Sequence, residues 1–117
     1  MEAQTIIDPT TFNELKDLMG SDFVIELIDT YINETGNLIE QLRQALTVQD
    51  STSFGRLAHS IKSSSASLGA LVFSQKAREL EMLGKANDLS EAGPKLERLA
   101  TDFLQVKNCL EELRDGS

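Results

Sequence analysis

The chain has 117 residues, which is enough for one hydrophobic core and too few for two. Its formal net charge is -8 and no basic patch is visible, which argues against nucleic acids and anionic membrane surfaces as partners. Aromatic residues make up only 5% of the chain, and two prolines and seven glycines leave long stretches of good helix formers. We therefore expect one all-α domain over residues 1–117, with its core at about 9–114.

The remaining composition bears on location and on metal or cofactor binding. No run of about 18 apolar residues occurs and the acidic N-terminus does not resemble a signal peptide, so we expect a cytoplasmic protein without membrane contact. The single cysteine, Cys109, excludes an internal disulfide, and one cysteine with one histidine does not make a conventional zinc site. We expect this chain to bind neither a metal nor a cofactor.

Two helices are predicted in the first half of the chain. Asp8 is a typical N-cap before Pro9, and a short apolar stripe follows up to Gly20, which predicts a helix over 9–19. A longer helix starts at Ser21 or Asp22. Its apolar residues recur at helical spacing, namely Val24, Leu27, Ile28, Tyr31, Leu38, Ile39, Leu42 and Leu46.

A third helix is capped by Asp50 or Ser51 and runs to Leu68, where Gly69 ends it. Its buried stripe has the three- and four-residue spacing of a helix and consists of Phe54, Leu57, Ala58, Ile61, Ser65 and Leu68. This helix carries the only histidine of the chain, His59.

The second half of the chain predicts two further helices. One spans about 70–86. The other begins between Ser90 and Pro94 and carries apolar residues from Leu96 to Leu113, while 114–117 reads as a frayed tail. Four long amphipathic helices with short connections favour an antiparallel up-down-up-down four-helix bundle, with the short helix at 9–19 capping one end.

His59 lies on the polar side of its helix, roughly 150° from the centre of the buried stripe. Its neighbours one or two turns away are small or cationic, namely Gly55, Arg56, Lys62, Ser63 and Ala66. These residues leave the ring uncovered. An isolated surface histidine is often incidental, but a neutral imidazole with a lysine one turn away is a competent nucleophile for a phosphoryl group.

The run from His59 to Ala70, HSIKSSSASLGA, resembles the signature of the histidine-containing phosphotransfer (HPt) domain family, H-x-x-K-G-S/A-S/A-x-x-x-G-A/L. The resemblance implies a kidney-shaped four-helix bundle that displays its acceptor histidine midway along one helix. A receiver domain docks over that histidine and passes a phosphoryl group from its aspartate to the histidine, or takes one back.

The resemblance assigns roles by position in the motif. His59 becomes the phospho-acceptor and Lys62 the cation beside the phosphate. Ser63 stands where the family usually has glycine, and we expect function to survive this small addition. Glu81 falls where family members often carry Gln or Glu that orients the imidazole, although an ordinary solvated glutamate is an equally good interpretation. The expected receiver-docking face comprises Gly55, Arg56, Ser63 and Ala66.

The resulting function is that of a monomeric phosphorelay carrier in two-component signalling, not an independent enzyme. No glycine-rich phosphate loop occurs in the chain, so we expect that it cannot phosphorylate itself from ATP. The resemblance implies that the receiver supplies Mg²⁺ and most of the catalysis. Receiver domains are the expected partners, with a hybrid sensor histidine kinase as a further candidate. Two alternatives are a pseudo-HPt scaffold that binds receivers without phosphotransfer and a histidine-kinase dimerisation fragment. In the kinase motif an acidic residue follows the histidine, whereas Ser60 follows it here.

Overall fold

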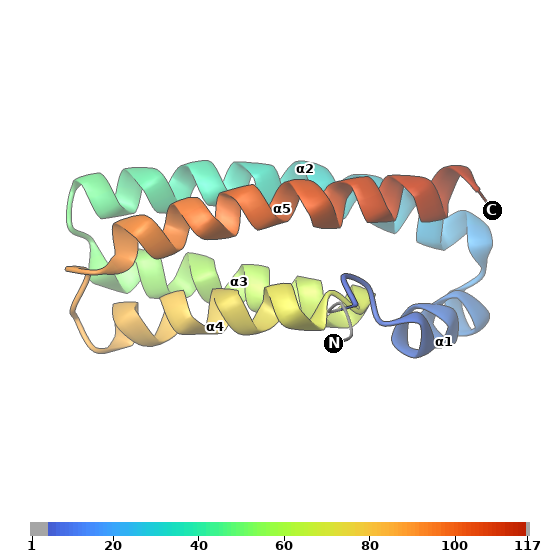
Figure 1. Cartoon of the computed structure of the whole chain (residues 1–117), viewed down its shortest axis with the longest axis horizontal. Coiled ribbons are helices and arrows are strands. Elements are labelled where there is room, and N and C mark those ends of the chain that lie inside the picture. The colour runs from blue at the N-terminus through green and yellow to red at the C-terminus, as the bar shows by residue number, and fades with distance from the viewer. Residues whose placement is uncertain (1–4, 117) are drawn as a thin grey trace.

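The computed structural model describes residues 5–116, and every regular element in this range is a helix (Figure 1). The helices are α1 (Pro9–Met19), α2 (Ser21–Thr47), α3 (Ser51–Leu68), α4 (Leu71–Lys85) and α5 (Ala92–Asp115). The last four run alternately up and down, which confirms the predicted four-helix bundle. Helix α1 lies at one end of the bundle, where it contacts α2 and α3.

Local capping explains the helix boundaries. The Asp8 carboxylate accepts a hydrogen bond from the Thr11 backbone N–H at 3.0 Å, and Asp50 does the same for Ser53 at 3.1 Å. Helix α3 ends at Gly69, whose φ of 94° is in the left-handed region that glycine adopts without strain. Because only Gly69 and Ala70 separate α3 from α4, these two helices form a tight antiparallel pair.

The core is mainly aliphatic, includes several aromatic rings and is shared by all four long helices. Its largest fully buried apolar side chains are Phe54, Ile28, Leu42, Ile61, Leu68, Leu80, Leu96, Leu99 and Leu110. A buried polar contact joins α2 to α3, where the Tyr31 hydroxyl and Ser65 Oγ lie 2.7 Å apart. Burial raises the pKa of Tyr31 to about 12, so this hydroxyl is neutral at physiological pH.

The ordered structure extends beyond both predicted ends of the core. Ile7 is buried, and the Asp8 N–H donates to the Gly69 carbonyl at 2.8 Å, which ties the N-terminal segment to the α3–α4 turn. At the other end α5 continues through Asp115, because Arg114 pairs with Asp29 of α2 at 2.6 Å. The fraying expected over 114–117 is therefore wrong for Arg114 and Asp115, and residue 117 lies outside the described residues.

Helix α1 is less buried than its apolar stripe predicts. Phe12 is its buried residue, whereas Leu18 is 81% exposed. The reason is its position at the end of the bundle, where it meets α2 and α3 and leaves one side in solvent.

Within residues 5–116, no helix has the length and apolar character needed to cross a membrane.

Backbone meets backbone where α3 crosses α4. A Cβ atom at Gly84 would lie 2.6 Å from the Cα and N atoms of Gly55, so the two glycines allow an approach that side chains would prevent. This crossing sets the spacing between the helices that carry His59 and Glu81.

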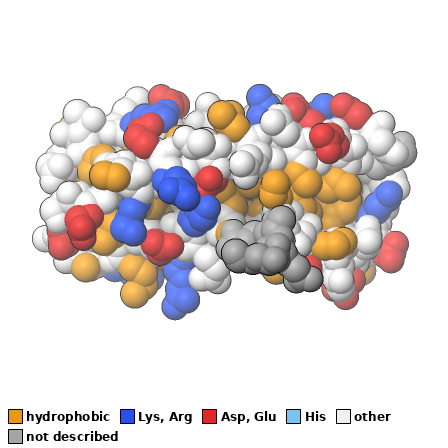
Figure 2. Space-filling model, in the orientation of Figure 1, with side chains coloured by type: hydrophobic (Ala, Val, Ile, Leu, Met, Phe, Trp, Pro, Cys, Tyr) orange, Lys and Arg blue, Asp and Glu red, His pale blue; other side chains and the backbone are white. Residues whose placement is uncertain are grey.

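The face formed by α4 and α5 shows acidic and basic side chains dispersed around apolar ones, and no histidine is visible on it (Figure 2).

Candidate functional site

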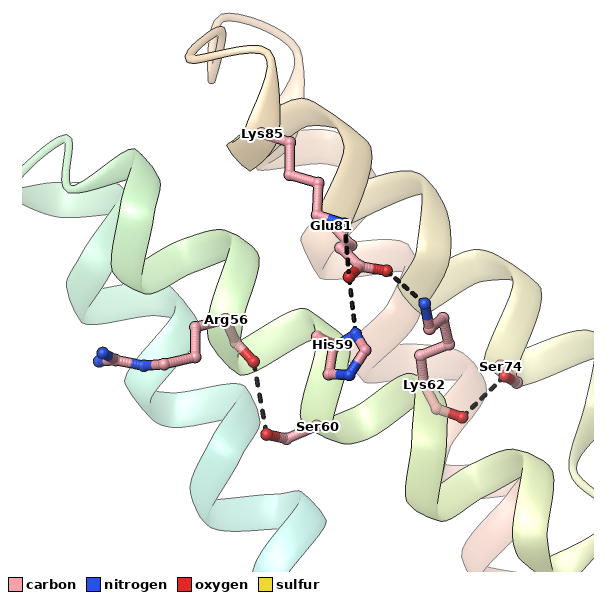
Figure 3. Close-up of polar contacts among 7 residues, drawn as sticks. All are labelled: Arg56, His59, Ser60, Lys62, Ser74, Glu81 and Lys85. Atoms are coloured by element: carbon pink, nitrogen blue, oxygen red, sulfur yellow. Dashed lines mark hydrogen bonds and ion pairs between the residues drawn. The ribbon is translucent and has the colours of Figure 1, made fainter.

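His59 projects from the middle of α3, and its side chain is 56% exposed, as its position on the polar face predicts. Its Nδ1 atom lies 2.7 Å from Oε2 of Glu81 on α4 (Figure 3). The other ring nitrogen points away from Glu81. The ring is thus held at one edge and open to solvent at the other.

Glu81 is buried, with a side chain only 3% exposed, so it is not an ordinary solvated glutamate. Its Oε1 accepts from Lys62 Nζ at 2.6 Å, and its Oε2 lies 2.7 Å from His59 Nδ1 and 3.3 Å from Lys85 Nζ. The Lys62 hydrogen bond, supported by those of His59 and Lys85, outweighs desolvation and lowers the pKa of Glu81 from 4.5 to about 2. The carboxylate is therefore charged at physiological pH.

An ionised Glu81 determines which of the two imidazole nitrogens carries the proton. A carboxylate only accepts hydrogen bonds, so the neutral His59 ring must carry its proton on Nδ1 to donate to Oε2. The lone pair is then on Nε2, at the exposed edge. The pair therefore presents a nucleophilic nitrogen to a large partner in one defined orientation.

Lys62 lies one turn from His59, as predicted, but it contacts the Glu81 carboxylate instead of standing free beside the ring. Its backbone carbonyl also accepts a hydrogen bond from Ser74 Oγ at 2.8 Å, a second link from α3 to α4. Lys85 completes the cluster and was not predicted from the sequence. The four-residue spacing from Glu81 was the available signal, since residues at that spacing share a helix face.

The four residues expected to dock a receiver have different environments. Ser63 is exposed and Ala66 is half-buried. Gly55 is buried against α4, so its small size serves the helix crossing. Arg56 is exposed, turns its guanidinium away from His59, and forms no ion pair with any residue of 5–116 within 4.0 Å. Their role in docking stays a prediction.

A groove of about 630 Å³ follows the α3–α4 seam beside His59. We call it the α3–α4 groove; it is lined by Ser51, Thr52, Gly55, Arg56, His59, Glu81, Gly84, Lys85 and Asn87. Residues 5–116 contain no cluster of three or more His, Cys, Asp or Glu side chains suited to a metal ion. The chemistry available here is nucleophilic attack by one exposed nitrogen, next to two lysines.

Comparison with known proteins identifies the family, because the sequence model of the Hpt domain matches residues 26–116. The chain belongs to the Hpt domain family. It is 30% identical to the phosphorelay protein LuxU of Vibrio harveyi over 88 residues, which cover 75% of this chain and 77% of LuxU. It is 33% identical to the sensor protein TorS of Escherichia coli K12 over 75 residues, which cover 64% of this chain but 8% of TorS.

The fold of this Hpt domain also matches a solved structure. The histidine-containing phosphotransfer protein B (HptB) of Pseudomonas aeruginosa PAO1 superposes with a TM-score of 0.91, covering 98% of this chain and 99% of that protein at 23% identity. The resemblance inferred from the HSIKSSSASLGA run is thus confirmed at the level of family and fold. The chain is a phosphotransfer carrier of two-component signalling.

Proposed function

We propose that Nε2 of His59 accepts a phosphoryl group from the aspartyl phosphate of a receiver domain and passes it to another receiver. The observation that carries this proposal is the 2.7 Å contact between His59 Nδ1 and the buried Glu81 carboxylate. It holds the ring in one tautomer and leaves the reactive nitrogen in the exposed position. Transfer of this kind depends mainly on positioning and charge neutralisation.

In the proposed step the Nε2 lone pair attacks phosphorus, and the bond between phosphorus and the aspartate oxygen breaks. The aspartate leaves as a carboxylate and the phosphoryl group becomes bonded to Nε2. The ring keeps its proton on Nδ1 and becomes cationic, and the Glu81 carboxylate at 2.7 Å stabilises that charge. Return of the group to a second aspartate follows the same path in reverse.

The domain acts as a carrier in this proposal, and it does not phosphorylate itself from ATP. The sequence holds no glycine-rich phosphate loop, and the groove beside His59 is lined by side chains and glycines of α3 and α4 and by Asn87, which follows α4. Mg²⁺ would be held by the receiver. We also propose that residues 1–117 form a single domain that works as a monomer in the cytoplasm.

Receiver domains are the proposed partners, and a hybrid sensor histidine kinase is a further one. The names of two relatives support this assignment, because LuxU is a phosphorelay protein and TorS is a sensor protein. The segment that matches this chain is 8% of TorS, so the activity of that whole sensor protein is not implied for this domain. A receiver-binding scaffold without phosphotransfer is the alternative that the experiment must exclude.

The test is transfer of label from a receiver charged with a small phosphodonor. The wild-type chain should acquire an acid-labile, base-stable phosphoryl group, and His59→Gln should acquire none while its melting temperature stays near that of the wild type. Label on His59→Gln would overturn the assignment of the acceptor. A wild-type chain that binds the receiver but takes up no label would favour the scaffold.

A further inference from the structure

We propose that the α3–α4 groove receives an acidic segment of the receiver that borders its phosphorylated aspartate. This inference rests on the proposed function, and it names which side of His59 the partner occupies. The groove begins at His59 and extends along the seam to Thr52 and Asn87. His59 is one of its lining residues, so a protein segment seated in it lies next to the ring that receives the phosphoryl group in the proposed function.

The shape of the groove follows from the glycine crossing. Gly55 and Gly84 lie where α3 and α4 touch, and neither has a side chain that would fill the space above the contact. The volume of about 630 Å³ is large enough for a short stretch of polypeptide and its side chains. Its lining also includes the polar residues Ser51, Thr52 and Asn87.

The charge of the groove differs from that of the whole chain. The formal net charge is -8, yet the groove contains Arg56 and Lys85 and a single carboxylate, Glu81, which is buried and already bonded to two lysines and the imidazole. Arg56 forms no ion pair within 4.0 Å with the described residues, although its charge also acts on Asp50 at longer range, and the Lys85 side chain is 69% exposed. The side chains that line the groove carry a net positive charge, which complements an acidic segment.

The other half of α3 offers no comparable surface. Beyond His59 the exposed residues include Ser60, Ser63 and Ser67, none of which lines the α3–α4 groove. The hydroxyl of Ser60 donates to the Arg56 carbonyl at 3.4 Å and that of Ser67 to the Ser63 carbonyl at 3.1 Å, so both are used within the helix. Recognition by charge is therefore concentrated on the side of α3 that leads to Thr52.

The proposal is tested by placing charges at matched distances on the two sides of His59. Thr52 and Ser67 are both exposed residues of α3, seven positions before and eight after the histidine. The variants are Thr52→Glu and Thr52→Lys in the groove, with Ser67→Glu and Ser67→Lys as controls. The readout is the Kd of an unphosphorylated receiver that is chosen by its binding to the wild-type chain, measured by calorimetry.

We expect Thr52→Glu to weaken binding about threefold to fivefold and Thr52→Lys to strengthen it by a similar factor, because one added charge acts at short range. Both effects should shrink as salt is raised, while both Ser67 variants stay within about a factor of 1.5 of the wild type. Equal weakening by Glu and Lys at position 52 would indicate steric contact without recognition of charge and would overturn the proposal. Unchanged binding by both, or larger effects at Ser67, would overturn the proposal.

Failure of this proposal is separable from failure of the proposed function. The Kd comparison does not require transfer, so a receiver that responds to Thr52 but never phosphorylates His59 supports the groove and contradicts the carrier role. Transfer to His59 without any response at Thr52 supports the carrier role and contradicts the groove proposal. If no receiver from the same genome binds the wild-type chain, the groove proposal fails as well. Melting temperatures of all four variants should match within a few degrees, since both positions face solvent.

Discussion

At the residue scale, Glu81 determines the arrangement of the site. It is a buried carboxylate whose charge is compensated by contacts from three side chains, Lys62, Lys85 and His59. Burial alone would raise its pKa, and the hydrogen bonds, led by that of Lys62, lower it to about 2. The site therefore contributes to the stability of the fold as well as to the orientation of the nucleophile.

The low pKa of Glu81 predicts a dependence of stability on acid. Because the folded-state pKa of about 2 is below the ordinary value of 4.5, the carboxylate contributes stability that is fully present above pH 4.5 and is lost as the pH falls towards 2. Glu81→Gln should remove this contribution, on the order of 3 kcal/mol. Urea unfolding at several pH values between 2 and 7 should show the wild type and variant converging in acid.

The control for this prediction is Glu79→Gln on the same helix. Glu79 is paired with Lys95 at 3.2 Å, but its side chain is 58% exposed. Exposed ion pairs contribute little, so the unfolding free energy of this variant should fall with decreasing pH as it does in the wild type. If the unfolding free energies of Glu81→Gln and the wild type differ by the same amount at every pH, the assigned role of Glu81 is contradicted.

The two lysines of the site should differ in their effect on stability. Lys62 lies 2.6 Å from the carboxylate and is 29% exposed, whereas Lys85 lies 3.3 Å away and is 69% exposed. Removing Lys62 leaves a buried oxygen without its donor, so Lys62→Met should cost about 1–3 kcal/mol of unfolding free energy. Lys85→Met should cost less than about 1 kcal/mol. Urea denaturation at neutral pH measures both, and the reverse order would be inconsistent with this geometry.

At the element scale, the crossing of α3 and α4 explains how the site is assembled. His59 and Glu81 lie on different helices, and their 2.7 Å contact exists only if these helices are closely spaced. A Cβ at Gly84 would lie 2.6 Å from backbone atoms of Gly55, whereas one at Gly55 would lie no closer than 3.6 Å to the atoms around it. The two glycines are therefore not equivalent.

Alanine substitutions at the crossing should reveal this asymmetry. Gly84→Ala must push the helices apart and should cost about 1–3 kcal/mol of unfolding free energy, whereas Gly55→Ala should change it by less than about 1 kcal/mol. Gly36→Ala on α2 meets no atom within 4 Å and should stabilise the fold by about 0.5–1 kcal/mol. The ¹⁵N shifts of the His59 ring should change in Gly84→Ala alone. A Gly84→Ala variant as stable as Gly55→Ala would contradict the close crossing.

Helix boundaries depend on local chemistry, and for this reason the sequence predicted them well. The Asp8 and Asp50 caps and the Gly69 stop act within a few residues, and the apolar stripe of α3 faces the core as its periodicity indicates. The exposure of Leu18 was not predictable in the same way. A stripe shows which side of a helix is apolar, but the amount of that side that is covered depends on the neighbours that the fold supplies.

The candidate site was predictable in part for a related reason. Exposure of His59 follows from its position on one helix, and the HSIKSSSASLGA run identifies its family. The burial of Glu81 and the participation of Lys85 depend on how α4 is rotated and spaced against α3. That geometry is set by Gly55 and Gly84, which are 29 positions apart, and no local pattern encodes such a contact.

At the scale of the whole molecule, the proposed single-domain monomer has a convenient internal probe. Tyr31 is the only tyrosine, the chain has no tryptophan, and the ring is buried between α2 and α3 with its hydroxyl 2.7 Å from Ser65. We expect tyrosine fluorescence and helical circular dichroism to report one coincident thermal transition. Light scattering should give a mass near 12.9 kDa. Separate transitions or a dimer mass would contradict the proposal.

The contact between His59 and a buried carboxylate on another helix means that the His59 ring loses conformational entropy during folding and not during binding. A free histidine ring samples several orientations, and restricting it typically costs a fraction of a kcal/mol to about 1 kcal/mol. Here the contact with Glu81 already restricts the ring when α3 and α4 pack, before any partner arrives. In the proposed reaction, therefore, a receiver that docks over His59 meets a ring that is already oriented. The lifetime that an encounter complex needs is correspondingly short, which suits a carrier that must release each partner in order to meet the next.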